Sequence, residues 1–412
     1  MIVDCCSAPG LKPYNEALEQ ILSSIVPIRE IELLPLEDCL ERILAEDLLS
    51  TNILPPWHCS AMDGYALNSG LYDANRPLTM VGSSFAGHPY DGKVNIGECI
   101  RIMTGACLPA DCDAVVMQEN VQLKDTKIII EAMVEPWQHV RKAGSEVTIG
   151  EIVLNQGQRI NPRNIGVAAS LGLSKIPVFR QLRVAIFSTG DELVPPGGTL
   201  LSGQIYDSNR YSVAAVCKRL GYEVIDYGLV ADDKEKIKAV MLEAAAIADV
   251  LLTSGGVSVG EADYVKPIIE EIGHIDLWKV AIKPGKPIAI GSIQQCKFFG
   301  LPGNPVSAMV TLNLLVQPAM QKLSGMELIP ATIISAICDT KLNKKAGRRD
   351  FQRGTAYTGD QGNWHVSSTG SQGSAKLTSL SQGNCYIVLD ENCTGVRAGE
   401  KVNVQLFDEV IR

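Results

Sequence analysis

The sequence predicts a multidomain protein of the α/β plus β class. We expect a doubly wound α/β domain with a β-rich inserted domain, a mixed α+β N-terminal domain and a C-terminal small β-barrel. The length of 412 residues suits about three domains at ~150 residues each. Between residues 182 and 327, short apolar runs alternate with helical patterns, which is typical of a sheet with parallel strands. Short β-like runs and glycine-rich turns fill the flanking regions, which favours small β modules there.

The charge balance excludes some classes of partner. Lysine and arginine total 37 against 46 acidic residues, which gives a formal charge of −9. A nucleic-acid-binding protein needs a basic footprint, so we expect no nucleic acid partner. An acidic protein that handles an anionic ligand needs local lysines and arginines, or a metal ion, to overcome its own field.

The sequence also predicts a cytoplasmic protein without membrane contact. No run reaches the ~18 apolar residues of a membrane span, and the start of the chain lacks a secretory pattern. The twelve cysteines include no CxxC pair, and neither Cys5-Cys6 nor Cys107 and Cys112 have a zinc spacing. We interpret the cysteines as reduced thiols rather than as disulfides or metal ligands.

The N-terminal linking domain is expected at residues 1–50 and 144–181. An amphipathic helix is predicted at 14–25, a strand at 31–35 and a second helix at 36–45. A further helix is predicted from Pro162 to Leu171, because proline suits the first turn of a helix.

The inserted β-rich domain is expected at residues 51–143. Its predicted strands lie at 78–81, 99–103, 114–117 and 127–130, separated in several places by about ten residues. Two tight turns in this region hold Asp63 and Thr104.

The α/β domain is expected at residues 182–327 and the C-terminal barrel at 328–412. The predicted α/β elements are strands at 182–187, 223–228, 250–252 and 296–300, and helices at 209–220, 234–248, 264–272 and 306–321. The predicted barrel strands lie at 331–338, 350–356, 364–367, 385–389 and 401–406.

The chain is organised around the stretch from residue 248 to 263. A buried strand there ends in Ser254, Gly255 and Gly256, and a loop with Glu261 and Asp263 follows. Glycines allow positive φ and let a ligand approach the backbone. A strand, a glycine loop and a helix in this order are how α/β sheets present a site.

Polar loops follow three of the predicted strands, at residues 189–192, 254–263 and 303–305. The carboxyl ends of parallel strands share one edge of the sheet, so these loops converge on one crevice that suits phosphate. The carboxylates there are Glu192, Asp232, Glu261 and Asp263. They have the oxygen ligands for Mg²⁺, which would bridge to an anion. Helix capping is the alternative role, strongest for Asp232 and its neighbour Asp233.

Three lysines lie close together in the sequence. If residues 279–283 form one strand, Lys279 and Lys283 share a face on either side of Ala281, and the following turn delivers Lys286. Three cations around a small gap suit a compact anion. The alternative is an exposed edge strand protected by lysines.

Six motifs in one order carry a family resemblance. They are SAMDGYA at 60–66, RIMTGA at 101–106, FSTGDEL at 187–193, GGVSVG at 255–260, KPGKP at 283–287 and LPGNPVS at 301–307. From about residue 10 to 405 the chain resembles the MoeA family of molybdopterin molybdenumtransferases, to which the gephyrin E-domain also belongs.

The resemblance implies four domains, an elongated homodimer and a role in molybdenum cofactor biosynthesis. The α/β domain would bind adenylylated molybdopterin with molybdate nearby. The enzyme would insert molybdenum at the dithiolene and release AMP, helped by Mg²⁺. Transient contact with other cofactor-biosynthesis proteins is also expected.

The same resemblance assigns roles to residues of this chain. Glu192, Asp232 and Asp263 would hold the metal, and Lys279 and Lys283 the molybdate or phosphate. Asp63, Thr104, Arg353 and Ser374 would reach the site across the dimer or from neighbouring domains. The catalytic set is Asp63, Thr104, Glu192, Asp263, Lys279 and Lys283. The substrate-binding set is Ser254, Gly255, Gly256, Ser258, Lys286, Pro302, Gly303, Asn304, Pro305, Arg353 and Ser374.

Two alternative functions stay open at this point. A molybdopterin adenylyltransferase uses a similar Gly-Gly loop but forms the pyrophosphate link that a molybdenumtransferase breaks. A non-catalytic scaffold of the gephyrin type would use the domain as an anchor. Glu146 departs from the family pattern, which has aspartate at that position.

Overall fold

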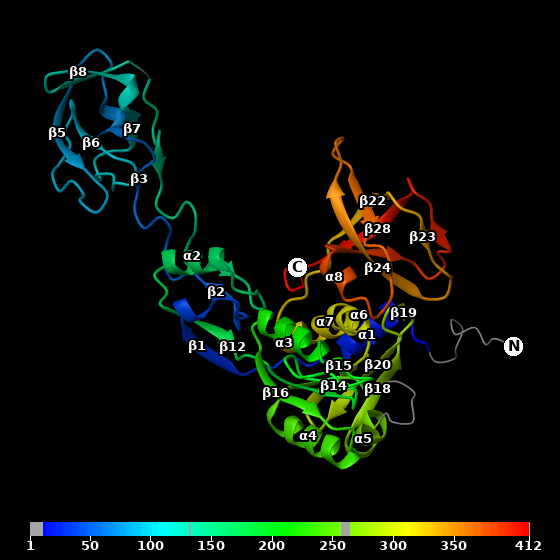
Figure 1. Ribbon diagram of the computed structural model, residues 1–412. Helices are drawn as coiled ribbons and strands as arrows, with labels where there is room; N and C mark the ends of the chain where they lie inside the picture. The colour runs from blue at the N-terminus through cyan, green and yellow to red at the C-terminus, as the bar shows by residue number, and fades with distance from the viewer. Residues whose placement is uncertain (1–10, 132, 257–263, 412) are drawn as a thin grey trace.

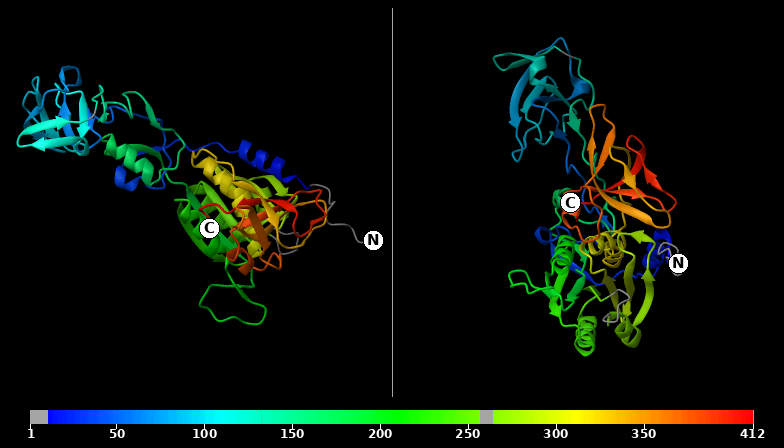
Figure 2. Two further views of the ribbon diagram at one scale, coloured as in Figure 1. Left: turned by 90° about the horizontal axis from the view of Figure 1, so that it is seen from above. Right: turned by 45° about the vertical axis from the view of Figure 1, so that its right-hand side comes forward.

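The computed structural model describes residues 11–131, 133–256 and 264–411, and it is elongated (Figure 1). One β module lies at one end, and the α/β domain and the C-terminal barrel lie together at the other (Figures 1 and 2). A linking region connects them, with β1 (Ile31–Pro35), β2 (Leu48–Leu49), α2 (Pro162–Ser170) and β12 (Lys175–Phe179). None of the helices in these ranges has the length and apolar character of a membrane span.

The α/β domain is built on a six-stranded sheet of order β16-β13-β17-β21-β20-β18. Its strands are β13 (Arg183–Thr189), β16 (Glu223–Val230), β17 (Val250–Ser254), β18 (His274–Lys279), β20 (Pro287–Ile293) and β21 (Cys296–Leu301). The first four strands in this order are parallel, as predicted, but β20 runs antiparallel to both of its neighbours, β21 and β18. Only Gln294 and Gln295 separate β20 from β21, and so short a turn forces a hairpin.

Helices cover both faces of this sheet (Figure 1). One face carries α1 (Tyr14–Ser23), α3 (Asn209–Arg219), α6 (Pro305–Thr311) and α7 (Gln317–Leu323), the last two joined by a π-helix at Leu312–Val316. The other face carries α4 (Lys234–Ile247) and α5 (Val265–Ile272). Along β13, Val184 and Ile186 enter the first core, whereas Ala185 and Phe187 enter the second. This alternation of side chains is what a strand buried on both faces requires.

Five strands form the closed C-terminal barrel, because β24 pairs with β26 as well as with β25. The strands are β22 (Ile333–Cys338), β24 (Arg349–Thr358), β25 (Trp364–Ser368), β26 (Cys385–Leu389) and β28 (Lys401–Leu406). The short elements β23 (Leu342–Asn343), β27 (Gly395–Val396) and α8 (Thr378–Ser381) complete it. Strand β19 (Ile282–Lys283) pairs with β24, so the sheet of the barrel continues into the α/β domain.

The β module at the far end is called the inserted module below. It is a six-stranded sheet of order β7-β4-β6-β5-β9-β8 with a separate pair of β3 and β10. The strands are β3 (Cys59–Ser60), β4 (Gly64–Leu67), β5 (Leu78–Ser84), β6 (Glu98–Ile102), β7 (Ala114–Met117), β8 (Val121–Lys124), β9 (Lys127–Ile130) and β10 (Val140–Arg141).

The linking region corrects one predicted helix. It contains β1 (Ile31–Pro35), β2 (Leu48–Leu49), β11 (Ile152–Leu154), β12 (Lys175–Phe179) and α2 (Pro162–Ser170). The helix predicted at 36–45 is wrong, since only a 3-10 turn at Leu36–Asp38 forms. Glu41 has φ +66°, which ends any right-handed helix, and Leu44 instead bridges to Val178 of β12.

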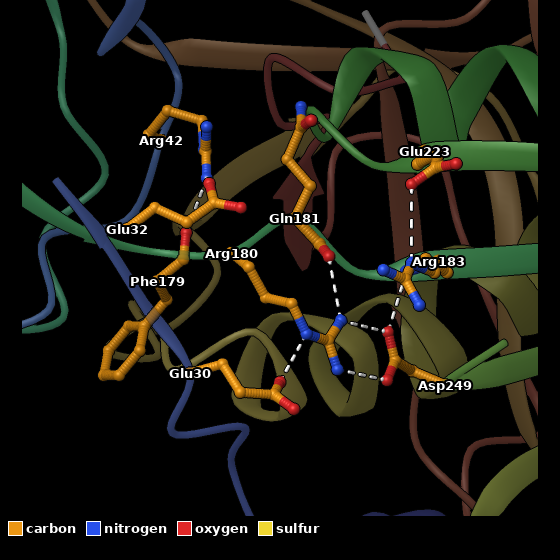
Figure 3. Close-up of polar contacts among 9 residues, drawn as sticks. All are labelled: Glu30, Glu32, Arg42, Phe179, Arg180, Gln181, Arg183, Glu223 and Asp249. Carbon is orange, nitrogen blue, oxygen red and sulfur yellow. Dashed lines mark hydrogen bonds and ion pairs between the residues drawn. The ribbon is translucent and has the colours of Figure 1, made fainter. Parts of the chain in front are cut away.

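An arginine joins the linking region to the α/β domain (Figure 3). Arg180, directly after β12, makes two hydrogen bonds of 2.7 Å to the carboxylate of Asp249, directly before β17. It also pairs with Glu30, on the other chain connection between the two parts. The side chains of Arg180 and Asp249 are each 18 % exposed, so water screens this bidentate pair only in part.

The environment of Asp249 favours its ionised form. Burial opposes the charge, but hydrogen bonds from the Arg180 guanidinium and the Arg183 amide outweigh it and lower the pKa of Asp249. The pairing therefore stabilises the fold fully above the ordinary pKa of an aspartate. The contribution is lost as the pH falls through the lowered pKa of the folded state.

We predict that Arg180→Ala loosens the linking region relative to the α/β domain. Asp249 would keep a partly buried charge without its main donors, which costs about 1–3 kcal/mol. Small-angle X-ray scattering should show a broader distribution of distances than the wild type has.

Arg183→Ala is the matched control, because its half-exposed side chain makes a 3.7 Å ion pair with Glu223 and has the smallest effect on the pKa of Asp249, while its amide still donates to Asp249 in the variant. It should leave the scattering profile unchanged. Identical profiles for Arg180→Ala and the wild type would contradict a clamp at this junction.

Candidate functional site

A pocket of about 390 Å³ lies at the carboxyl ends of β13, β17 and β21, where the sequence predicted a crevice. It is lined by Thr189, Glu192, Leu193, Ile205, Tyr206, Asp207, Ser208, Asn209, Ser254, Gly255, Pro287, Pro302, Gly303, Asn304 and Pro305. The structure thus brings together Glu192, Ser254, Gly255 and the 302–305 loop from the predicted site.

The two glycines after β17 are required by the backbone. Gly255 has φ +96°, and a Cβ there would lie 2.5 Å from the carbonyl oxygen of Thr189. Gly256 has φ +67°, and a Cβ there would lie 2.5 Å from Val265 of α5. Larger residues would force the loop off the sheet edge, so the close approach of β13, β17 and α5 depends on bare backbone.

Asn209, the first residue of α3, holds two walls of the pocket together. Its amide nitrogen donates 2.8 Å hydrogen bonds to the Ser254 hydroxyl and to the Gly303 carbonyl. The sequence predicted this asparagine only as the first residue of the helix at 209–220. The signal that could have found it is the polar run of residues 207–209, which enters a helix beside the same sheet edge.

A buried ion pair lies under the same wall. Asp207 is 2 % exposed and receives a 3.0 Å hydrogen bond from Arg210, which also pairs with Asp226 at 2.5 Å. Burial opposes the charge of Arg210, but hydrogen bonds to Asp226 and Asp207 outweigh it and raise its pKa. The Arg210 cation therefore offsets the negative charge of Asp207 beside the pocket, so an anionic ligand meets less repulsion there.

Two of the predicted metal-binding carboxylates lie at or behind the pocket wall. Glu192 is exposed and lines the pocket. Asp232 accepts hydrogen bonds from the Thr189 hydroxyl and, at 3.3 Å, from the Asp191 amide, so it positions the loop after β13. In the described ranges, no group of three or more His, Cys, Asp or Glu side chains could hold a metal ion.

These carboxylates fit an Mg²⁺ ion that takes only one or two of its ligands from the protein. Mg²⁺ commonly keeps waters and binds one or two carboxylates together with phosphate oxygens of a substrate. Glu192 supplies one such carboxylate. Asp263, Ser258 and Glu261 lie outside the described residues.

The lysine segment borders the pocket but is not one strand. Strand β18 ends at Lys279, where it pairs with the pocket residue Pro287, and β19 begins only at Ile282. Val280 bridges to Lys12 instead, which interrupts the expected shared face of Lys279 and Lys283.

The two later lysines have different surroundings. Lys283 pairs at 3.1 Å with Asp350 of the barrel, whose side chain is 3 % exposed. Lys286 is half-buried, and its carbonyl accepts from Val280. Lys283 thus already has a carboxylate partner at the junction of two domains.

Asp63 and Thr104 meet each other but lie in the inserted module. One oxygen of Asp63 accepts from the amide and the hydroxyl of Thr104, both at 2.7 Å. These bonds, the amide first, lower the pKa of Asp63. The module lies at the opposite end of the molecule from the α/β domain, whose strand ends form the pocket (Figure 1). Neither residue, nor the exposed Glu146, lines the pocket of its own chain.

The barrel contributes one residue near the pocket and one in its own interior. The Ser374 carbonyl accepts a 3.0 Å hydrogen bond from the Val306 amide, directly after the pocket residue Pro305. Arg353 is fully buried and donates 3.1 Å hydrogen bonds to Ser379 and to the Gly373 carbonyl. Arg353 thus holds the loop that carries Ser374, and its contact with a ligand stays a prediction.

We predict that Asn209→Ala separates the two walls of the pocket. The buried Ser254 hydroxyl would lose a donor, at a cost of about 1–3 kcal/mol, and the carbonyl of the exposed residue Gly303 would lose its hydrogen bond to α3. Hydrogen exchange at the Gly255 amide, which donates to Leu301, should become faster.

Ser208→Ala serves as the matched control. Ser208 is the neighbouring residue and also lines the pocket, but its side chain makes no capping hydrogen bond. Equal exchange rates in Asn209→Ala and Ser208→Ala would show that the Asn209 amide does not hold the walls.

Comparisons with known proteins agree with this architecture. Residues 12–172 match the MoeA N-terminal region (domain I and II), 185–322 a probable molybdopterin binding domain, and 335–407 the MoeA C-terminal region (domain IV).

Individual relatives span nearly the whole chain. A molybdopterin molybdenumtransferase from Haemophilus influenzae is 42 % identical over 96 % of this chain and 99 % of its own. Gephyrin from Dictyostelium discoideum is 31 % identical over 98 % of this chain and 63 % of its own. The crystal structure of a molybdopterin biosynthesis MoeA protein from Pyrococcus horikoshii has a TM-score of 0.80 and 34 % identity, and the match covers 97 % of this chain and 99 % of that one. The chain belongs to the MoeA family.

Proposed function

We propose that this protein is a molybdopterin molybdenumtransferase of molybdenum cofactor biosynthesis. It inserts molybdenum from molybdate into adenylylated molybdopterin and releases AMP. The observation that carries the proposal is the pocket at the carboxyl edge of the α/β sheet, in the region that matches a probable molybdopterin binding domain. The adenylyltransferase and scaffold alternatives are not favoured, because a relative named molybdopterin molybdenumtransferase matches 96 % of the chain.

The pocket suits a ligand with a phosphate bridge. Gly303 and Asn304 are exposed at its rim, and a Cβ at Gly303 would meet nothing within 4 Å, so a ligand can approach this backbone. In the proposed site the loops 254–258 and 302–305 bind the adenylylated pterin, with Lys286, Arg353 and Ser374 in support. Lys279, beside Pro287, supplies positive charge for molybdate.

Mg²⁺ is proposed as the cation of this site, held by Glu192, Asp232 and Asp263. When bound it would neutralise charge on the phosphate bridge as AMP leaves. Glu192 supports a metal site at the pocket, since it is one of the residues that line it.

A homodimer is proposed because of the inserted module. Asp63 and Thr104 can reach the pocket only if a second copy of the chain supplies them. In their own chain the inserted module lies at the opposite end of the molecule from the α/β domain. In a dimer with two-fold symmetry, each copy would supply the same residues to the site of the other copy. We also propose a cytoplasmic location and transient contact with other cofactor-biosynthesis proteins. The domain boundaries given above are proposed as well. They place α1 in the linking domain, and this helix packs on the core of the α/β domain.

The activity is tested by AMP release from adenylylated molybdopterin with molybdate and Mg²⁺. We predict that Glu192→Gln needs at least about tenfold more Mg²⁺ for half-maximal release, because one anionic ligand is lost. Glu223→Gln, far from the pocket on the first residue of β16, should titrate like the wild type.

Two outcomes would count against this assignment. AMP release that does not depend on molybdate would contradict the proposed reaction. An unchanged Mg²⁺ titration in Glu192→Gln would remove Glu192 from the metal site but leave the reaction standing.

The dimer is tested by mixing two defective variants, Asp63→Asn and Lys279→Ala. Each alone should lose most of its turnover. After unfolding and joint refolding, half of the dimers are mixed and each mixed dimer has one intact site, so about a quarter of wild-type turnover should return. No recovery would mean that Asp63 and Lys279 act within one chain. Full turnover of Asp63→Asn alone would mean that Asp63 has no role in the reaction.

A further inference from the structure

Two cysteines of the inserted module face each other across paired strands. Cys59 of β3 forms an antiparallel bridge with Cys107, which follows β6. The flanking hydrogen bonds run from the Ser60 amide to the Ala106 carbonyl, at 3.0 Å, and from the Leu108 amide to the His58 carbonyl, at 2.8 Å. Cys59 and Cys107 are therefore a non-hydrogen-bonded pair, the arrangement in which opposing side chains are closest.

This geometry suits a cross-link. Opposed residues of a non-hydrogen-bonded pair have Cα atoms about 4.5 Å apart, and disulfides span Cα separations of about 4.4–6.8 Å. Side chains opposite each other on antiparallel strands also leave the same face of the sheet. The two thiols can thus meet without movement of the backbone.

One cysteine of the pair, Cys107, is more accessible than the other cysteines of the module. Cys59 is 7 % exposed, but Cys107 is only half-buried, so a small reagent can reach one of the two sulfurs. Cys99 and Cys112 are both buried, and burial raises the pKa of each thiol to about 12. Those two stay protonated and unreactive, because the thiolate is the form that attacks a disulfide. Burial, and then the charge of the neighbouring Cys59, also raise the pKa of the Cys107 thiol, so its reaction with a disulfide should become faster as the pH rises.

We propose that Cys59 and Cys107 form a reversible cross-strand disulfide when the protein meets a low-molecular-weight disulfide such as oxidised glutathione. Cys107, as the thiolate, attacks one sulfur of glutathione disulfide and releases a first glutathione thiolate. Cys59 then loses its proton and attacks Sγ of Cys107, which forms the protein disulfide and releases the second glutathione. Two protein thiols are oxidised and one external disulfide is reduced to two thiols.

The cross-link would act on the turns that carry Asp63 and Thr104. Cys59 lies four residues before Asp63, and Cys107 three residues after Thr104. Between them, the Gly105 amide donates a 2.8 Å hydrogen bond to the Ser60 carbonyl. A disulfide would oppose opening of this segment and hold Asp63 against Thr104. Its formation does not depend on the proposed activity.

The experiment treats the full-length protein with oxidised glutathione, blocks the remaining thiols and maps disulfides by mass spectrometry. The expected result is a peptide linked through Cys59 and Cys107, lighter by two hydrogens and cleaved by dithiothreitol. In the same sample, hydrogen exchange at the Gly105 amide should slow. Cys393→Ser is the matched control, since Cys393 is a half-buried thiol of the distant barrel, and it should leave the link intact.

Cys59→Ala and Cys107→Ser should each abolish the link, and either variant suffices if the other fails to fold. A lasting mixed disulfide of Cys107 with glutathione, without the internal link, would overturn the proposal. So would a bridge from either cysteine to Cys5, Cys6 or any other thiol, or complete blocking of both cysteines after oxidation.

Discussion

One side-chain amide connects the helix and the loops that form the pocket. Asn209 starts α3 and donates both amide hydrogens, one to Ser254 at the end of β17 and one to Gly303 after β21. Without it, the buried Ser254 hydroxyl and the Gly303 carbonyl would each lose this donor, and the two loops would lose their shared contact with α3. The positive φ of Gly255 sets where the first loop turns, because its backbone lies against Thr189 of β13. The pocket therefore depends on three paired strand ends and on the amide of Asn209, which joins two of their loops to α3.

The elongated shape places the remaining predicted chemistry outside that pocket. Asp63 and Thr104 form a compact turn of their own in the inserted module. The Arg180–Asp249 pair fixes the base of the linking region on the α/β domain, and so constrains where that module lies. At the other side, Lys283 and Asp350 join the barrel to the α/β domain, and the Ser374 carbonyl contacts the start of α6. Each connection rests on a specific polar contact between two parts of the molecule.

The sequence was most informative for segments in which a single pattern of apolar residues runs from end to end. The strands β13, β17 and β21 and their polar ends were predictable, because doubly buried strands read as apolar runs and parallel strands share an edge. Predictions failed where a single backbone angle or a distant partner decides the outcome. Glu41 takes a positive φ and ends the helix expected at 36–45, and Val280 pairs with Lys12 and interrupts the expected lysine strand. The partners of Asn209 come from residues far along the chain, which no local pattern specifies.

The most direct test of the pocket is a crystal structure of this protein with adenylylated molybdopterin bound. We predict that the phosphate bridge lies against Gly303 and Asn304, that the ligand fills the space between Asn209 and Glu192, and that Asp63 of a second copy approaches it. Ligand density away from the carboxyl edge of β13, β17 and β21 would contradict this account.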